Sequence, residues 1–220
     1  MAVWLNTVFH GFDYSILSFY NVLAKSAGDF LTPLMIFISF FGKGGIMMIV
    51  LGVILLLFKK TRKCGVTALI GILIGYILVN LTIKPLVDRE RPFVYDEYRP
   101  FWEIVGMTSG GGKSFPSGHT NVVACALAGI FFASKNKKVT WTLFIPVLLM
   151  GISRNYLIVH YPTDVIVGGL VGTLSAFLGH LLVNFLYKKM NEHLTNKVCD
   201  FILNASIVDL FVKKPKDTEN

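Results

Sequence analysis

The stretch GVTALIGILIGYILVNLTI, residues 65–83, contains no charged side chain. Because a helix needs about 20 apolar residues to cross the hydrocarbon core of a bilayer, this stretch predicts a membrane-spanning helix. The whole chain is similarly apolar: 54% of its residues are hydrophobic, 15% are charged, and its mean hydropathy is +0.62. A soluble domain carries about 25% charged residues. The composition therefore favours an integral membrane protein.

Four further apolar runs predict spans, at residues 45–58, 117–134, 139–157 and 165–187. The run at residues 13–41 differs because Lys25 and Asp29 interrupt it. A charge near the middle of a bilayer costs about 2.5 kcal/mol or more. We therefore expect an interfacial helix followed by a half-buried one in this run, with a single long crossing as the alternative.

The predicted fold class is all-α: a polytopic transmembrane helical bundle of five to six spans, with interfacial helices at the N- and C-terminal ends. The length of 220 residues fits a single membrane domain. Residues 1–42 form its interfacial or partly embedded N-terminal segment, residues 43–188 the bundle that carries the motifs, and residues 189–220 an amphipathic cytoplasmic tail. The tail is predicted from the helical spacing of its apolar residues between Leu194 and Val208.

Clusters of lysine and arginine predict the orientation of the chain. They are KKTRK at 59–63, KNKK at 135–138, and Lys188 with Lys189. By the positive-inside rule this side is cytoplasmic, so the loop 85–116 and the loop around His160 face outward. The net charge of +8 is carried by short clusters between apolar runs, which is typical of attraction to anionic lipid rather than to nucleic acid. We expect a multi-pass plasma-membrane protein.

Three polar clusters lie at the outer ends of the predicted spans: KPLVDRERP at 84–92, PSGH at 116–119 and SRNYLIVHYPTD at 153–164. Taken singly, each has an ordinary structural explanation. They are a basic helix end, a capped helix start and a histidine at a membrane interface. The predicted topology places all three on one face of the membrane, and this joint placement favours a shared site.

The residue types in these clusters suit a phosphate group. Lys84, Arg91 and Arg154 supply positive charge, and the planar fork of arginine matches phosphate oxygens in pairs. Ser117 and Gly118 open a helix, where free backbone N–H groups and the positive end of the dipole favour an anion. The pattern predicts a phosphate-binding site built without a metal.

Two histidines and an aspartate add the chemistry of phosphoryl transfer. A neutral imidazole is able to attack phosphorus, and a second, protonated imidazole is able to protonate the leaving oxygen. Asp164 follows His160 by four residues across Pro162, so its carboxylate is placed to orient one ring nitrogen of His160. We therefore predict His160 as the nucleophile and Asp164 as the group that orients it.

The spacings K-x6-R-P, P-S-G-H and S-R-x5-H-x3-D, in this order, resemble the signature of the type-2 phosphatidic acid phosphatase superfamily. The matching positions are Lys84, Arg91, Pro92, Pro116, Ser117, Gly118, His119, Ser153, Arg154, His160 and Asp164. The resemblance covers roughly residues 40–188 and fills every motif position. One departure is that the usual first crossing, ahead of the interfacial segment, is missing.

The resemblance implies a helical bundle, usually of six crossings. It implies a phosphohistidine intermediate on His160 with His119 as general acid. The residues that it implies for phosphoryl binding are Lys84, Arg91, Ser117, Gly118, His119 and Arg154.

Together these observations predict a lipid phosphatase that acts at the outer face, with undecaprenyl diphosphate as the first candidate substrate and phosphatidic acid or phosphatidylglycerophosphate as the second. The alternatives from other classes are a vanadium-dependent haloperoxidase and a non-enzymatic lipid-binding or transport protein. The expected partners are the lipid phosphate and membrane lipids, and no metal or other cofactor is expected.

Arg89 lies outside the motif, and we expect it to pair with an acid such as Glu90; binding of a head group is the alternative.

Overall fold

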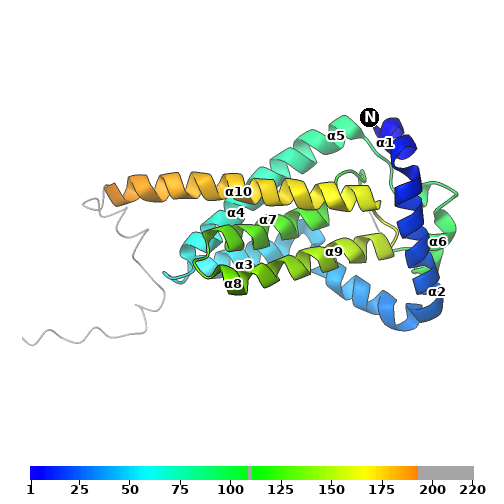
Figure 1. Ribbon diagram of the computed structural model, residues 1–220, viewed down its shortest axis with the longest axis horizontal. Helices are drawn as coiled ribbons and strands as arrows, with labels where there is room; N and C mark the ends of the chain where they lie inside the picture. The colour runs from blue at the N-terminus through cyan, green and yellow to red at the C-terminus, as the bar shows by residue number, and fades with distance from the viewer. Residues whose placement is uncertain (109–110, 193–220) are drawn as a thin grey trace, which may run out of the picture.

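The computed structural model describes residues 1–108 and 111–192. Within these ranges the chain is helical and forms no strand, which confirms the all-α prediction for the part described. The main bundle helices are α3 (Ile46–Leu56), α4 (Arg62–Tyr76), α7 (Gly118–Ala133), α9 (Phe144–Tyr156) and α10 (Pro162–Glu192). Figure 1 shows them running along the long axis of the molecule, with α4 continued by the π-helix η2 (Ile77–Ile83) and by α5 (Lys84–Val87).

Three helical segments are long and apolar enough to cross a membrane. They are His10–Leu56, Arg62–Val94 and Pro162–Glu192, while α7 is apolar but shorter. Large apolar side chains on these segments are exposed, including Leu73 at 58% and Leu170 at 65%. A helix satisfies its own backbone hydrogen bonds, so it can present such side chains to lipid. The structure thus supports three candidate spans, and the figure of five to six spans stays a prediction.

The run at 139–157 is less regular than the single span predicted for it. It divides into the end of α8 (Lys137–Thr140), the 3-10 helix η4 (Trp141–Leu143) and α9. Tightening of the chain from α-helical to 3-10 geometry is common at the ends of helices. The short α9 nevertheless ends at the polar cluster that contains Arg154, and so delivers this cluster to one end of the bundle.

Small residues set the spacing of α4, α7 and α10. The four-residue spacing of Gly168, Gly172 and Ala176 predicts a close helix contact. A Cβ atom at Gly172 would stand 2.5 Å from the carbonyl oxygen of Asn121 in α7. A Cβ atom at Gly71 in α4 would lie 3.1 Å from the Cα atom of Ala176. The three backbones therefore approach one another at distances that only glycine permits, and the predicted contact is confirmed.

The N-terminal segment covers one end of the bundle. After α1 (Ala2–Val8), the first half of α2 (His10–Phe40) runs across the bundle end, and its second half turns back along the bundle (Figure 1). The turn lies at Ala27, whose φ and ψ of −136° and 19° are not helical. Lys25 and Asp29 flank this turn and are exposed. The predicted break in the run is therefore present, while its interfacial position remains a prediction.

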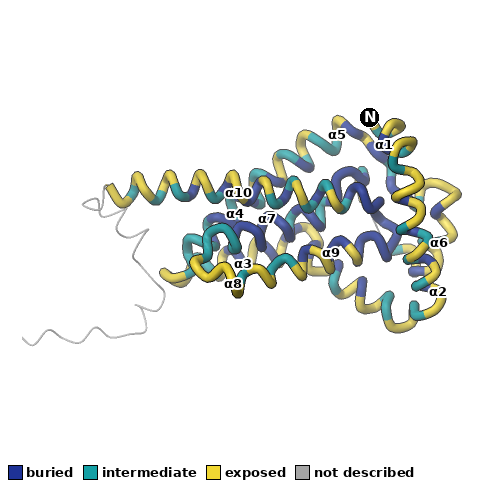
Figure 2. Tube along the Cα trace, in the orientation of Figure 1, coloured by how far each residue is buried: buried dark blue, intermediate teal, exposed yellow. Residues whose placement is uncertain are grey.

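The polypeptide that follows α5 lies at the same end. It contains η3 (Pro92–Val94) and α6 (Arg99–Ile104). Side chains of α2 and of the segment around α6 form a buried apolar cluster with residues 156–161; its members include Leu17, Tyr98, Tyr156 and Val159. This cluster fixes the loop that carries His160. Figure 2 shows the buried residues at this end continuing into the middle of the bundle.

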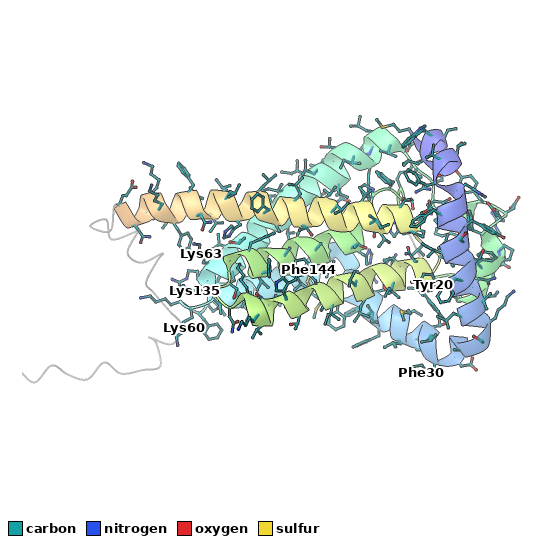
Figure 3. The ribbon with its side chains drawn as sticks, viewed as in Figure 1. Tyr20, Phe30, Lys60, Lys63, Lys135 and Phe144 are labelled. Carbon is teal, nitrogen blue, oxygen red and sulfur yellow. The ribbon has the colours of Figure 1, made fainter. Side chains whose placement is uncertain are left out.

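The opposite end of the bundle carries the basic loops. Figure 3 shows Lys60, Lys63 and Lys135 at this end, far from Tyr20 and Phe30 of α2. The clusters used to predict orientation therefore lie together, at the end away from the polar motifs. The predicted amphipathic tail, residues 189–220, lies outside the described residues except for residues 189–192, which belong to α10.

Candidate active site

The predicted site residues come together at the end of the bundle that α2 crosses. A cavity of about 640 Å³ is lined by Lys84, Arg91, Gly118, His119, Arg154 and His160, among others. They come from α5, the segment after it, the start of α7, the end of α9 and the loop before α10. Ser117 and Asp164 do not line the cavity; both lie behind it, with 0% of their surface exposed. The three clusters are therefore parts of one arrangement.

His160 is oriented by groups on α10 and on the segment before α7. Its Nδ1 lies 3.4 Å from Oδ2 of Asp164 and 3.4 Å from Oγ of Ser114. Its Nε2 lies 3.4 Å from Nη1 of Arg91, which lines the cavity. Helix α10 begins at Pro162, whose fixed φ suits a first helical position, so Asp164 stands in the first turn. One ring nitrogen thus faces the carboxylate.

Two side chains and two backbone N–H groups fix Asp164 from several directions. Oδ2 of Asp164 accepts hydrogen bonds from the Tyr161 backbone N–H at 3.0 Å and from the Ser114 hydroxyl. Oδ1 accepts from Nη1 of Arg89 at 2.8 Å. The backbone oxygen of Asp164 accepts from the Ser117 N–H at 2.9 Å, which joins α10 to the start of α7. The carboxylate is therefore held in one orientation.

Arg91 is held by the main chain. It donates from Nη1 to the carbonyl oxygen of Val159 at 2.7 Å, from Nη2 to that of Gly111 at 2.7 Å and from Nε to that of Gly112 at 3.0 Å. The second N–H of Nη1 faces Nε2 of His160, while Nη2 carries a second N–H for a further acceptor. Arg91 is thus fixed in position beside His160 and keeps a donor for an anion.

Arg154 is buried at the other side of the cavity, with 4% of its surface exposed. It donates through Nη1 to the hydroxyl of Ser39 at the end of α2. Its Nε has no hydrogen-bond partner among the described residues. A buried donor without a partner costs about 1–3 kcal/mol, so an anion bound here would satisfy it.

The start of α7 combines a cap with an open approach. The Ser117 hydroxyl accepts from the backbone N–H of Thr120 at 3.4 Å and from the Thr120 hydroxyl at 3.0 Å. The hydroxyl therefore caps the helix, as serine commonly does, and its predicted part in phosphoryl binding stays a prediction. A Cβ atom at Gly118 would stand 3.6 Å from Nζ of Lys84, so the missing side chain leaves the first turn of α7 open beside this ammonium group.

The electrostatics of the cavity keep His160 neutral. Burial lowers its pKa well below the ordinary value of 6.5, and the positive charges of Arg91, Arg154 and Lys84 lower it further. A neutral imidazole has a free lone pair, which is the form that a nucleophile needs.

His119 packs against a glycine that sequence reasoning missed. A Cβ atom at Gly42, in the turn after α2, would stand 2.9 Å from Cδ2 of His119. Three more contributors were missed: Ser39, Ser114 and Asp13. A partial signal existed for Asp13, because a carboxylate inside an apolar helix is a candidate functional residue by itself.

Arg89 pairs with acids, as expected, but Glu90, the acid named as an example, is not one of them. Arg89 forms ion pairs with Asp13 at 2.8 Å and with Asp164 at 2.8 Å. Glu90 pairs instead with Lys113. Arg89 is 0% exposed, so its charge is satisfied inside the protein, where neighbours in sequence are not its neighbours in space.

Comparison with known proteins yields one family. The model of the PAP2 superfamily matches residues 65–188. A protein of Sulfolobus acidocaldarius named undecaprenyl-diphosphatase is 33% identical over 160 residues, covering 72% of this chain and 71% of its own. A Bacillus subtilis protein named undecaprenyl-diphosphatase BcrC is 28% identical over 194 residues, covering 85% and 89%.

Two solved structures share the fold. One is a PAP2-type phosphatidylglycerolphosphate phosphatase from Bacillus subtilis, with a TM-score of 0.57 and 26% identity over 86% of this chain and 96% of that one. The other is LpxE of Aquifex aeolicus, with a TM-score of 0.60 and 22% identity over 74% and 93%.

Proposed function

The chain belongs to the PAP2 superfamily and is a phosphoric ester hydrolase of the membrane, and on this premise we propose that it hydrolyses a lipid diphosphate at the outer face of the plasma membrane through a phosphohistidine on His160. One observation carries the proposal. Two imidazoles and three cations from separate segments of the chain line a single cavity, and a carboxylate stands behind one imidazole.

The first step forms the phosphoenzyme. Nε2 of His160 attacks phosphorus while Lys84, Arg91 and Arg154 hold the phosphoryl oxygens. A P–N bond forms as the P–O bond to the leaving group breaks, and His119 gives its proton to the leaving oxygen. The positive charge that develops on His160 is stabilised by Asp164, which keeps the proton on Nδ1.

The second step releases phosphate. His119, now neutral, takes a proton from a water molecule as the water oxygen attacks phosphorus. The P–N bond breaks, inorganic phosphate leaves, and His160 returns to its neutral form. Each histidine therefore ends the cycle in the state in which it began. His119 is protonated when the anionic substrate is bound, because the phosphate offsets the cations of the cavity.

A lipid is the proposed substrate because the cavity continues into an apolar region. Its remaining lining includes Ile49 of α3, Leu69, Ile72 and Leu73 of α4, and Val122 of α7. A phosphate bound at the cationic end would thus have apolar side chains along its attached group. The names of the two relatives favour undecaprenyl diphosphate. The Bacillus subtilis structure favours phosphatidylglycerophosphate as the second candidate.

A substrate panel tests the proposal. Purified protein in detergent is offered undecaprenyl diphosphate, phosphatidylglycerophosphate and phosphatidic acid, and released phosphate is measured. We expect the highest kcat/KM with undecaprenyl diphosphate, and an acid-labile, base-stable phosphoenzyme when labelled substrate is quenched early. Halide oxidation supported by vanadate would indicate a haloperoxidase. Binding of all three lipids without phosphate release would indicate a lipid-binding protein.

The proposed chemistry uses no metal. Among the described residues, no group of three or more His, Cys, Asp or Glu side chains is placed to hold a metal ion, and the cavity is lined by cations that repel one. We therefore expect EDTA to leave the rate of phosphate release unchanged at saturating substrate. Restoration of lost activity by added magnesium would contradict this.

A further inference from the structure

Arg89 lies behind the proposed active site and contacts five side chains. Its Nη1 donates to Oδ1 of Asp164 and to Oγ1 of Thr163, each at 2.8 Å. Its Nη2 donates to Oδ2 of Asp13 and its Nε to Oδ1 of Asn6, again at 2.8 Å. The guanidinium also stacks on the ring of Tyr161 at 3.7 Å. These contacts come from α1, α2 and α10, so Arg89 joins the N-terminal helices to the first turn of α10.

Asp13 holds the same helical turn from a second direction. Its Oδ1 accepts from the backbone N–H of Thr163 at 3.0 Å, and its Oδ2 accepts from the Thr163 hydroxyl at 2.9 Å. Thr163 precedes Asp164 at the start of α10, where backbone N–H groups have no partner inside the helix. Asp13 is 1% exposed. The carboxylate from α2 thus fixes the backbone next to Asp164, while Arg89 fixes its side chain.

The contacts of Asp164 are divided between its two oxygens. Oδ1 is bound by Arg89, and Oδ2 faces Ser114, the Tyr161 N–H and His160. Because a carboxylate is planar, fixing Oδ1 also fixes the direction in which Oδ2 points. Asp13 supplies a second negative charge to Arg89, so the group of three keeps a net charge of −1 next to His160. This is the charge that a developing imidazolium requires.

We propose that Arg89 and Asp13 form a positioning pair that aims Asp164 at His160 and so makes the N-terminal helix α2 part of the catalytic apparatus. The inference rests on the proposed role of Asp164. A purely structural pair is the competing explanation, because buried ion pairs also hold elements together and their net contribution to stability varies. The two explanations differ in kinetics.

The main test replaces both charges at once. Asp13→Asn with Arg89→Gln removes both charges of the pair, keeps amides that are able to form hydrogen bonds, and conserves the net charge of −1, which Asp164 then carries without an ion-pair partner. We expect kcat to fall by about 100-fold at constant KM. Residues that orient metal ligands by hydrogen bonding provide the comparison, since their substitution costs about 10- to 100-fold in activity. Asp13→Asn alone should lower kcat by about 10-fold, and Arg89→Lys should retain part of the activity because lysine still supplies a cation.

The pH profile provides a readout that a structural role would not move. Lys84, Arg91, Arg154, His119 and Asp164 face His160 in the wild type and in the double variant. Without the guanidinium on Asp164, its negative charge acts more strongly on the imidazole and raises its pKa. The acid limb of kcat/KM should therefore shift to higher pH. Melting in detergent, measured in parallel, reports the fraction of folded protein.

Two further variants separate the possible outcomes. Glu97→Gln removes the exposed ion pair of His10 and Glu97 at 3.1 Å, which also ties α2 to the outer loop but does not reach Asp164, and it should leave kcat unchanged. Asp164→Asn reports on the proposed mechanism itself. A large loss in Asp164→Asn with wild-type kcat and pH profile in the double variant would overturn the positioning pair alone. Full activity of Asp164→Asn would overturn the mechanism on which it rests. If the double variant does not fold, an unchanged kcat in Asp13→Asn overturns the pair.

Discussion

The end of the bundle that α2 crosses and the body of the bundle are held together by different interactions. Where α2 crosses the bundle, buried side chains pair through charge and hydrogen bonds, as Arg89 does with Asp13 and Asp164. In the body of the bundle, backbones approach one another through glycine, as at Gly172 and Asn121. The charged network requires particular nitrogen and oxygen atoms at hydrogen-bond distance, whereas the glycine contacts require that no Cβ atom stands between the backbones. Substitutions in the first region should therefore affect chemistry, and substitutions in the second should affect the fold.

His160→Ala is expected to cause the largest loss of activity without loss of folding. This change removes the proposed nucleophile, so phosphate release should fall by about 10⁴-fold or more, as for other members of catalytic triads. The helix contacts of the body are untouched, so the protein should still elute as a folded species in detergent. His10→Ala is the control, since His10 is exposed and forms its ion pair with Glu97 at the surface. Turnover by His160→Ala at the rate of the control would refute the assignment.

Gly172→Ala tests the opposite region. The added methyl group would stand 2.5 Å from the Asn121 carbonyl oxygen and 2.7 Å from Cβ of Ala124, so α10 and α7 must move apart. Overpacking of this kind costs about 1–3 kcal/mol of unfolding free energy. We expect a lower melting temperature in detergent and an unchanged kcat for the protein that remains folded.

Gly169→Ala is the matched control, three residues earlier on the same helix. There the nearest atom to an added Cβ would be Cγ2 of Thr120 at 3.7 Å, an ordinary contact. Equal melting temperatures for the two variants would show that close backbone approach does not hold the body together.

The pH dependence of the wild-type enzyme tests whether the cations of the cavity keep His160 neutral. The cations around His160 and its burial depress its pKa below 6.5, and the neutral form is the proposed nucleophile. As pH falls, activity is lost only when it passes the depressed pKa. The acid limb of kcat/KM, corrected for the titration of the substrate phosphate, should therefore lie below pH 6.5. A substrate-independent limb at pH 6.5 or higher would mean that the cavity does not suppress the charge on His160.

The sequence predicted the body of the fold well because lipid imposes a strong and local rule. Apolar runs of the required length became helices, and the serine signal marked the start of α7 at Ser117. Helix α10 begins at Pro162, three residues before the span predicted at 165–187. The break at Ala27 lies between two charges, which was a visible signal. The π-helix at Ile77–Ile83 had none, because its hydrogen bonds differ from those of an α-helix while its composition does not.

The candidate site was predictable only where it follows motif spacing. Those residues line or adjoin one cavity, while their roles remain to be tested. Asp13 and Ser39 were missed because their partners, Thr163 and Arg154, lie more than a hundred residues away along the chain. No periodicity reports such a pair. Arg89 was assigned to the wrong partner for the same reason, since sequence proximity favoured Glu90.

The smallest effect on activity is expected for Lys113→Gln. This change breaks the surface ion pairs of Lys113 with Asp88 and Glu90, which contrast with the buried pair of Arg89 and Asp13. Lys113 lies 2.8 Å from Asp88 and also pairs with Glu90, and the hydrogen bonds that its ammonium group donates to both carboxylates raise its pKa. Water screens charges at such a surface, so these pairs contribute little. We expect phosphate release within about twofold of wild type at physiological salt. Lys113 adjoins Ser114, which hydrogen-bonds Asp164. A tenfold loss would therefore show that the surface pair holds this segment in place, and that the charged network behind His160 extends to the surface.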